Sequence, residues 1–244
     1  MGTFGGAQPI VTDGLVFAVD AANYESYTSG STTWSDLAGN NNGTLINGPT
    51  FDSGNGGSIV FDGTNDRVDI GYTPEGQSSI TICSWFKTTR TTRQVLVGAY
   101  SGTSGNTNAF AINLNRGSSL NEQDSVLYFA RIGTGTSNTQ SSYATSTSLS
   151  NGNWHFLTVT HDLPTGTAVI NMDGTDYSVT DTASSSSGPW GLFEFDSMIG
   201  ANNIEGTAGV FVDGQVSCMS IYNRVLSSSE ILQNYNALKG RFGL

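Results

Sequence analysis

The sequence predicts an all-β fold, a sandwich of two antiparallel sheets. Short apolar runs recur between turn clusters along the whole chain, and they do not alternate with amphipathic helices. Glycine accounts for 31 of the 244 residues, and only 12% of residues are Asp, Glu, Lys or Arg. This polar but weakly charged composition is expected of a sheet protein with many turns. A chain of this length can form one such domain and bury its core without disulfides.

About a dozen apolar runs are predicted to be strands, more than an immunoglobulin-type sandwich uses. They lie at residues 15–19, 59–61, 68–70, 80–86, 95–97, 110–114, 126–130, 156–159, 168–172, 177–179, 210–212 and 216–222. Asp173-Gly174 predicts a tight hairpin, and the turn sequence 62–66 predicts a second tight connection. Long loops are expected at three polar stretches that contain few apolar residues, 101–108, 133–150 and 182–188.

One helix is predicted, near the C-terminus at 228–238. Ser227 and Glu230 have the spacing of a capping box, in which each side chain bonds a backbone N–H of the other residue. Apolar residues then recur at helical spacing until Lys239-Gly240 ends the pattern. We expect the helix to pack on the outside of the sandwich through a stripe of Ile231, Leu232, Tyr235 and Leu238.

The net charge and the cysteine content exclude some classes of function. The net charge of −11 and the pI of about 4.3 repel phosphate groups, so nucleic acid and anionic membranes are poor partners. The acidity either keeps the surface soluble or serves cation binding. Cys83 and Cys218 lie in apolar runs without metal-ligand spacing, so buried free thiols are favoured. A disulfide between the two cysteines is the alternative. No signal peptide or membrane span is visible, which predicts synthesis and folding in a cytoplasm.

Several motifs follow one another in the order of a known family. They are Gly14-Leu-Val-Phe-Ala-Val-Asp20, Trp34-Ser-Asp-Leu-Ala-Gly-Asn40, Phe61-Asp-Gly63, Ile80-Thr-Ile-Cys-Ser-Trp-Phe86, Trp154-His-Phe-Leu-Thr-Val159, Met172-Asp-Gly174 and Ile221-Tyr-Asn-Arg-Val-Leu-Ser227. By these motifs the chain resembles the laminin-G-like group of the concanavalin-A-like lectin/glucanase superfamily. The resemblance implies one jelly-roll domain over 14–238, an N-terminal arm over 1–13 and a C-terminal tail over 239–244. The family usually has acidic residues before its final strand, where this chain has Ser217 and Cys218, so no role of those acids is carried over.

The end of the chain has a further resemblance. The segment Tyr222-Asn-Arg-Val-Leu-Ser-Ser-Ser-Glu-Ile231 and the Lys239-Gly-Arg-Phe-Gly243 tail resemble those of domains in structural proteins of marine tailed phages. This implies a non-catalytic virion surface protein, made in the host cytoplasm and docked on capsid or tail proteins or on copies of itself. The Gly-rich segment 1–9, with Phe4 as its main apolar anchor, and the tail are expected to contact another chain. The alternative is a carbohydrate-binding adhesin that attaches to a cell-surface glycan.

Catalysis is not expected. Glucanases of the superfamily place two carboxylates on alternate residues of one strand, so that both project into one cleft. The nearest pattern is Glu194 and Asp196, but Ile199 stands where the second catalytic Glu would fall. Glycoside hydrolysis is therefore only a distant third possibility, and these acids are expected to lie on a loop or rim.

The sequence contains two candidate binding sites of different kinds. Asp62, Asn65 and Asp66 supply oxygen ligands suited to calcium in a tight turn, although turns require the same residues for backbone reasons alone. Trp190 and Phe193 lie with Phe195 beside a polar loop, where aromatic rings either pack in the core, face a protein partner or stack on a sugar. Tyr100 and Tyr143 are further candidate ligand-binding residues.

Overall fold

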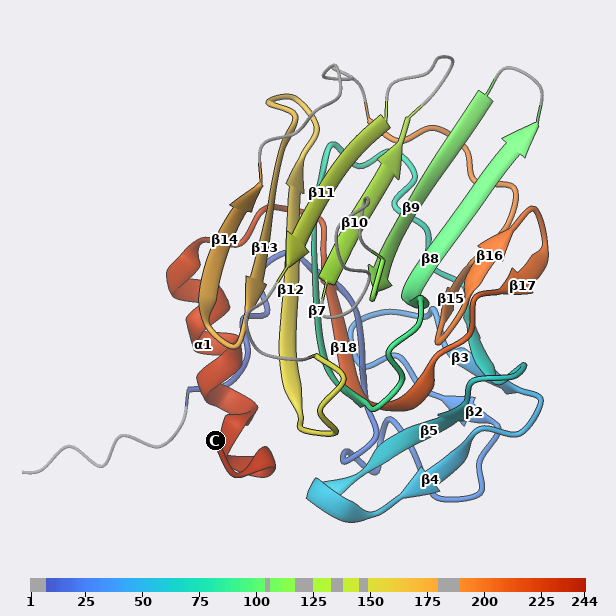
Figure 1. Ribbon diagram of the computed structural model, residues 1–244, viewed down its shortest axis with the longest axis vertical. Coiled ribbons are helices and arrows are strands. Elements are labelled where there is room, and N and C mark those ends of the chain that lie inside the picture. The colour runs from blue at the N-terminus through green and yellow to red at the C-terminus, as the bar shows by residue number, and fades with distance from the viewer. Residues whose placement is uncertain (1–7, 104–105, 117–124, 133–137, 145–148, 180–188) are drawn as a thin grey trace, which may run out of the picture.

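The computed structural model describes residues 8–103, 106–116, 125–132, 138–144, 149–179 and 189–244. In these residues two sheets face each other and one helix lies on the outside (Figure 1). The predicted all-β sandwich is therefore confirmed.

The first sheet has eight strands and the second has ten. The first runs in the order β14 (Thr175–Val179), β13 (Thr167–Met172), β12 (His155–Asp162), β7 (Ser79–Thr88), β18 (Asp213–Tyr222), β5 (Ser58–Asp62) and β4 (Thr50–Asp52), with β1 (Leu15–Asp20) beside β18. The second runs in the order β11 (Asn138–Ala144), β10 (Ser125–Arg131), β9 (Asn106–Leu114), β8 (Gln94–Thr103), β15 (Ser197–Ile199), β6 (Arg67–Ile70), β3 (Gly43–Ile46) and β2 (Thr33–Trp34), with β16 (Asn202–Ile204) and β17 (Thr207–Gly209) beside β8. Among the described strands, only β16 and β8 pair in parallel.

Strand β7 shows how one sequence pattern serves two apolar layers. Ile80, Ile82 and Phe86 belong to the main core between the sheets. The intervening Cys83 and Trp85 belong to a second apolar cluster, which the helix and the C-terminal residues share. Because successive strand residues face opposite sides, β7 supplies apolar side chains to both clusters, and eight of its ten residues are buried.

The two predicted tight connections join different kinds of neighbours. Asp173-Gly174 joins β13 to β14 as the predicted hairpin, with both residues in the left-handed region at φ of 52° and 86°. The turn 62–66 instead connects β5 in one sheet with β6 in the other. It carries the chain across the sandwich edge between sheets and is not a hairpin.

Some strand predictions are wrong. Strand β11 lies inside the predicted loop 133–150, and β8 and β9 extend into the predicted loop 101–108. The backbones of these polar segments pair in the ladder, but their sequences carry no apolar signal. Residues 210–212 link β17 to β18 instead of forming a strand, and Val210 has a φ of 58°. The polar stretch 182–188 lies outside the described residues.

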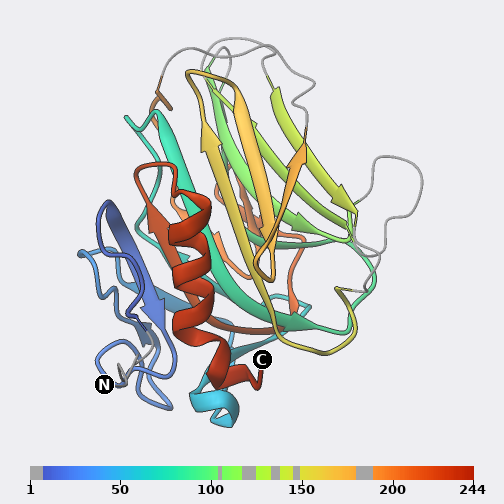
Figure 2. The same ribbon diagram turned by 90° about the vertical axis from the view of Figure 1, so that its left-hand side faces the viewer.

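The helix α1 (Ser228–Leu238) begins and ends where the sequence predicts, and it lies against the eight-stranded sheet (Figure 2). The capping box of Ser227 and Glu230 is present. The predicted packing stripe is wrong at one position, because Leu232 is 46% exposed. Buried Asn234 faces the sandwich in its place.

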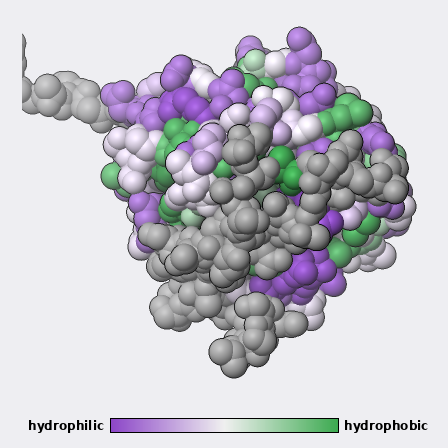
Figure 3. Space-filling model, turned by 90° about the horizontal axis from the view of Figure 1, so that it is seen from above, coloured by the Kyte–Doolittle hydropathy of each residue, from purple (hydrophilic) through white to green (hydrophobic). Residues whose placement is uncertain are grey.

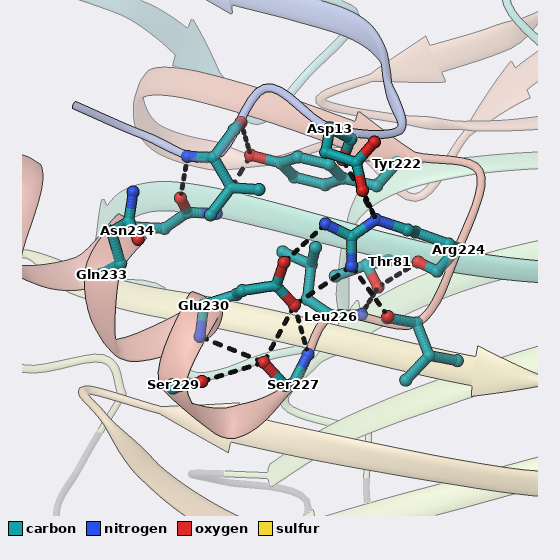
Figure 4. Close-up of polar contacts among 12 residues, drawn as sticks. Asp13, Thr81, Tyr222, Arg224, Leu226, Ser227, Ser229, Glu230, Gln233 and Asn234 are labelled. Atoms are coloured by element: carbon teal, nitrogen blue, oxygen red, sulfur yellow. Dashed lines mark hydrogen bonds and ion pairs between the residues drawn. The ribbon is translucent and has the colours of Figure 1, made fainter.

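The start of α1 carries an ion pair that links stability to pH. Arg224 contacts both carboxylate oxygens of Glu230, at 2.6 and 3.0 Å (Figure 4). This contact and the Ser227 N–H lower the pKa of Glu230 from 4.5 to about 2. Because the folded-state pKa is depressed, the stabilisation is present above pH 4.5 and is lost as the pH falls towards 2.

We therefore expect Glu230→Gln to be less stable than the parent chain at neutral pH, with a difference that shrinks as the pH falls below about 5. Urea unfolding midpoints of both proteins across this range measure the effect. Glu25→Gln, an exposed acid on another loop, is the control and should show no such convergence. A Glu230→Gln difference that stays constant with pH would contradict the prediction.

The N-terminal segment is held by the helix and the last strand. The Val11 N–H donates to Asn234 Oδ1 at 2.8 Å, and the Tyr222 hydroxyl donates to the Val11 carbonyl at 2.9 Å (Figure 4). Gln233 Nε2 donates to the Pro9 carbonyl at 2.8 Å. Residues 9–11 are thus bound to their own domain, while residues 1–7, including Phe4, lie outside the described residues.

The C-terminal tail is also packed on the sandwich. It forms a short 3₁₀ helix, η2 (Lys239–Phe242). The ring of Phe242 stacks on Trp85 with centroids 4.2 Å apart, and Arg241 pairs with Asp20 at 3.0 Å. These contacts account for the position of the tail without a second chain, so its contact with a partner stays a prediction.

Cys83 and Cys218 are buried free thiols, as the sequence favours. They lie on the paired strands β7 and β18, but their direct backbone partners are Ser220 and Trp85. Burial raises the pKa of the Cys83 thiol to about 11, which keeps it protonated and unreactive at neutral pH.

Candidate functional site

A polar groove of about 300 Å³ opens beside β15 and the β16–β17 hairpin. These strands lie at the right of Figure 1. Its walls come from β6, from the segment before β15 and from the β16–β17 turn. The side chains that give it chemical character are three carboxylates, one guanidinium, one amide and one aromatic ring, from Asp69, Glu194, Asp196, Arg67, Asn203 and Phe195.

The groove lies on the outer face of the ten-stranded sheet. Met198, which lines the groove, pairs with Asp69 on one side and with Gly98 on the other, so the three residues form one row across β6, β15 and β8. The adjacent row contains Val68 and Ile199, which belong to the core. Because neighbouring rows face opposite sides of a sheet, the Asp69 row faces away from the core.

One wall is fixed by an ion pair along β6. Arg67 and Asp69 are two residues apart on the same face, and Arg67 Nε lies 2.9 Å from Asp69 Oδ1. A second, longer contact of 3.5 Å joins the guanidinium NH2 to Oδ2. Asp69 thus occupies two of the guanidinium nitrogens and holds the arginine along the wall.

The facing wall is held by backbone hydrogen bonds. The Glu194 N–H donates to Ser101 Oγ at 2.8 Å, which ties the segment to β8. Buried Asn203 donates to the Asp196 carbonyl at 2.8 Å and accepts from the Gly206 N–H at 2.8 Å. The positions of Glu194 and Asp196 are therefore set by the fold before any ligand arrives.

Phe195 is the aromatic residue of the groove. Its ring lies over Gly206, where a Cβ atom would come within 2.9 Å of the ring. Gly206 also has a φ of 83°, so glycine is favoured there both by the backbone and by the ring. The ring is half-buried, which leaves part of it open on the groove side.

The structure corrects the predicted role of Trp190 and Phe193 in ligand binding. They are 1% and 7% exposed. Trp190 packs edge-on against His161 and Phe193 against Phe110 in the main core. Both rings are enclosed by other core side chains, so neither is open to a ligand. They anchor the segment that presents Phe195 at the surface, a difference that aromatic content alone does not reveal.

The other two aromatic candidates are only partly placed. Tyr100 is half-buried near the same edge of β8, its hydroxyl accepts from Arg131 at 3.4 Å, and its carbonyl accepts from the Glu205 N–H at 3.0 Å. It supports the β16–β17 turn and does not line the groove. The backbone of Tyr143 pairs with Val126, and its side chain lies outside the described residues.

The turn 62–66 uses its carboxylates to bond its own backbone. Asp62 Oδ1 accepts from the Thr64 N–H at 2.8 Å, which lowers the pKa of Asp62. Asp66 Oδ2 accepts from the Asp62 N–H at 3.1 Å, and burial raises the pKa of Asp66. Asn65 is exposed. Within the described residues no cluster of three or more His, Cys, Asp or Glu side chains is placed to hold a metal ion, and calcium at this turn stays a prediction.

Comparison with known families settles the family. The family model of laminin-G type in the concanavalin A-like lectin/glucanase superfamily matches residues 62–232 of this chain, which is more than half of its length. The chain belongs to this superfamily. The match begins at the turn before β6 and ends within α1, so it includes every residue that gives the groove its character. No match was found among curated proteins.

Solved structures agree with the fold at low sequence identity. The binding domain of botulinum neurotoxin DC, in complex with rat synaptotagmin II, has a TM-score of 0.65 at 10% identity over 93% of this chain and 52% of its own. Domain 4 of an extracellular arabinanase from Geobacillus stearothermophilus, in complex with arabinotriose, has a TM-score of 0.62 at 15% identity over 91% and 98%. A Trypanosoma rangeli sialidase in complex with sialic acid has a TM-score of 0.61 at 14% identity over 93% and 33%. These likenesses show the fold alone, and the chain spans about half the toxin domain and a third of the sialidase.

The distribution of hydrophobic residues on the described surface indicates what kind of partner the protein can bind. Seen from above, its hydrophobic residues form separate small patches among hydrophilic ones (Figure 3). A broad apolar interface is therefore not visible on the described part of this face. Among the described residues, no helix is long and apolar enough to cross a membrane.

Proposed function

We propose that this chain is a non-catalytic carbohydrate-binding domain and that its ligand lies in the groove on the outer face of the ten-stranded sheet. The observation that supports it is the combination in one groove of an aromatic ring with hydrogen-bonding groups, Phe195 beside Glu194 and Asp196. An aromatic face packs on the apolar C–H face of a sugar, and carboxylates accept hydrogen bonds from its hydroxyl groups.

The groove is suited to a short saccharide. Its volume of about 300 Å³ is at the lower end of the range for small-molecule sites, and it is open along one side. Asn203 and Ser101 hold the backbone of both acidic residues, so the segment that carries them needs no reordering when a ligand binds. Fold relatives solved with arabinotriose and with sialic acid support a role in sugar recognition for this chain.

The same geometry favours binding over hydrolysis. A glycoside hydrolase keeps one carboxyl group in a desolvated pocket, where it serves as the general acid. Glu194 and Asp196 are both exposed to solvent, and Ile199, at the position expected for a second catalytic carboxylate, is an apolar residue buried in the core. We therefore propose that the acids of the groove serve recognition.

We expect Phe195→Ala to weaken glycan binding by about tenfold, because the sugar loses its stacking face. The melting temperature should change little, since the ring is only half-buried. A glycan array identifies the ligand, and calorimetry on the parent chain and the variant measures the loss. Leu192→Ala, an exposed apolar residue that does not line the groove, is the matched control. An array that retains no glycan on the parent chain would rule out this function.

We also propose that the domain is a surface protein of a tailed-phage particle, held by capsid or tail proteins. This proposal rests on the sequence of the C-terminal segment 222–243 and is separate from the groove. Its test is to locate the chain in a cryo-electron microscopy map of purified particles. Absence of the chain from the particles would leave the carbohydrate-binding proposal intact and remove the virion role.

A further inference from the structure

We propose that the groove selects uncharged glycans and rejects anionic sugars, and that Asp69 is the residue that sets this specificity by occupying the guanidinium of Arg67. The inference rests on the proposed carbohydrate-binding function and names the class of sugar that the site accepts. Asp69 is thus a specificity-determining residue in the groove wall.

The groove lining is negatively charged. Three carboxylates and one guanidinium give the groove lining a formal net charge of −2. The chain as a whole carries a net charge of −11, so the long-range field has the same sign. A uronic or sialic acid entering the groove would meet like charges at close range, whereas an uncharged hydroxyl group would find hydrogen-bond acceptors.

Arg67 is the one cationic side chain in the groove lining. A guanidinium is the side chain best suited to a sugar carboxylate, because its planar fork can donate two parallel hydrogen bonds. Arg67 lies in the groove wall but already donates from Nε and NH2 to Asp69, at 2.9 and 3.5 Å. The two side chains project from the same face of β6, one strand repeat apart, so the pair is built into the strand. Asp69 thereby neutralises the one cationic side chain in the lining and occupies two of its nitrogens.

One substitution at Asp69 should release the guanidinium of Arg67. Asp69→Asn keeps the size of the side chain, removes one negative charge and weakens the hold on Arg67. The freed guanidinium then faces the groove as a donor for an anionic sugar. Glu194→Gln is the matched variant, because it removes one negative charge from the same groove while the Arg67–Asp69 pair stays formed. The difference between the two variants isolates the release of Arg67 from the general loss of charge.

The experiment measures binding to pairs of glycans that differ in charge. Lactose is paired with 3′-sialyllactose, and methyl-esterified oligogalacturonides with the free-acid forms of equal length, within a wider array of neutral sugars and their sulfated or sialylated counterparts. The readout is the ratio of anionic to uncharged binding within each pair, which cancels any change in overall affinity. The parent chain, Asp69→Asn, Glu194→Gln and the double variant Asp69→Asn/Arg67→Gln are compared at low and at physiological salt, and their melting temperatures confirm folding.

We expect the parent chain to bind the uncharged member about tenfold more tightly in each pair that binds. In Asp69→Asn the ratio of anionic to uncharged binding should rise about tenfold, and in Glu194→Gln it should rise by clearly less. In the double variant the gain seen in Asp69→Asn should disappear. Equal binding of both members by the parent chain would overturn the inference and leave the proposed function standing. Equal ratios in Asp69→Asn and Glu194→Gln would overturn the role of Arg67. If no glycan of either charge is retained, the proposed function itself fails, and the inference with it.

Discussion

Replacing Phe242 with alanine should destabilise the whole domain by roughly 3 kcal/mol, the cost of removing a large buried aromatic side chain. The ring is 9% exposed and stacks on Trp85 at 4.2 Å between ring centroids. It also packs on Trp154 at 4.8 Å. Trp85 belongs to β7, a central strand of the eight-stranded sheet, so a cavity beneath the tail reaches the middle of that sheet.

Urea unfolding monitored by tryptophan fluorescence measures this loss, because both stacking partners are tryptophans. Leu244→Ala is the control, two residues further along and 55% exposed, and it should change the free energy of unfolding by less than about 0.5 kcal/mol. If Phe242→Ala is as mild as the control, the 3₁₀ helix would be a detachable appendage. That result would favour the view that the tail exists to contact another chain.

The elements whose structure depends on residues close in the sequence could be predicted from the sequence. The capping box of Ser227 and Glu230 fixed the start of α1, and the alternation in β7 followed the two buried faces. Strands of two or three residues, such as β2 and β15, are too short for a period to be visible. Strand β11 pairs through its backbone with polar side chains, so nothing in its sequence distinguishes it from a loop.

The candidate site depended on contacts between distant segments. Arg67 and Asp69 alternate with apolar residues, so their exposure on one face of a strand could be predicted from the sequence. Their position opposite Glu194, more than a hundred residues later, follows from the pairing of β6 with β15, which no local pattern announces. The sequence likewise marks an aromatic cluster, but only the packing of Phe193 in the core decides that Phe195 points outward.

Replacing Asn234 with alanine should destabilise the protein by roughly 2–3 kcal/mol, because it leaves buried polar groups without partners. Asn234 is buried on the sandwich side of α1. Its Oδ1 accepts from the Val11 N–H at 2.8 Å, and its Nδ2 donates to the Tyr222 hydroxyl at 3.0 Å. Tyr222 in turn donates to the Val11 carbonyl, so the three residues close one ring of hydrogen bonds between the N-terminal segment, β18 and α1 (Figure 4).

Asn236→Ala provides the matched comparison, since it makes the same chemical change at an exposed position of the same helix. Alanine improves helix propensity equally at both sites, so the difference in unfolding free energy between the two variants reports the buried network alone. Hydrogen exchange adds a local measurement, because the Val11 amide loses its acceptor only in Asn234→Ala and should exchange faster there. Equal stability of the two variants, with unchanged exchange at Val11, would show that the N-terminal segment is held by other contacts and that the buried asparagine is not what fastens it to the helix.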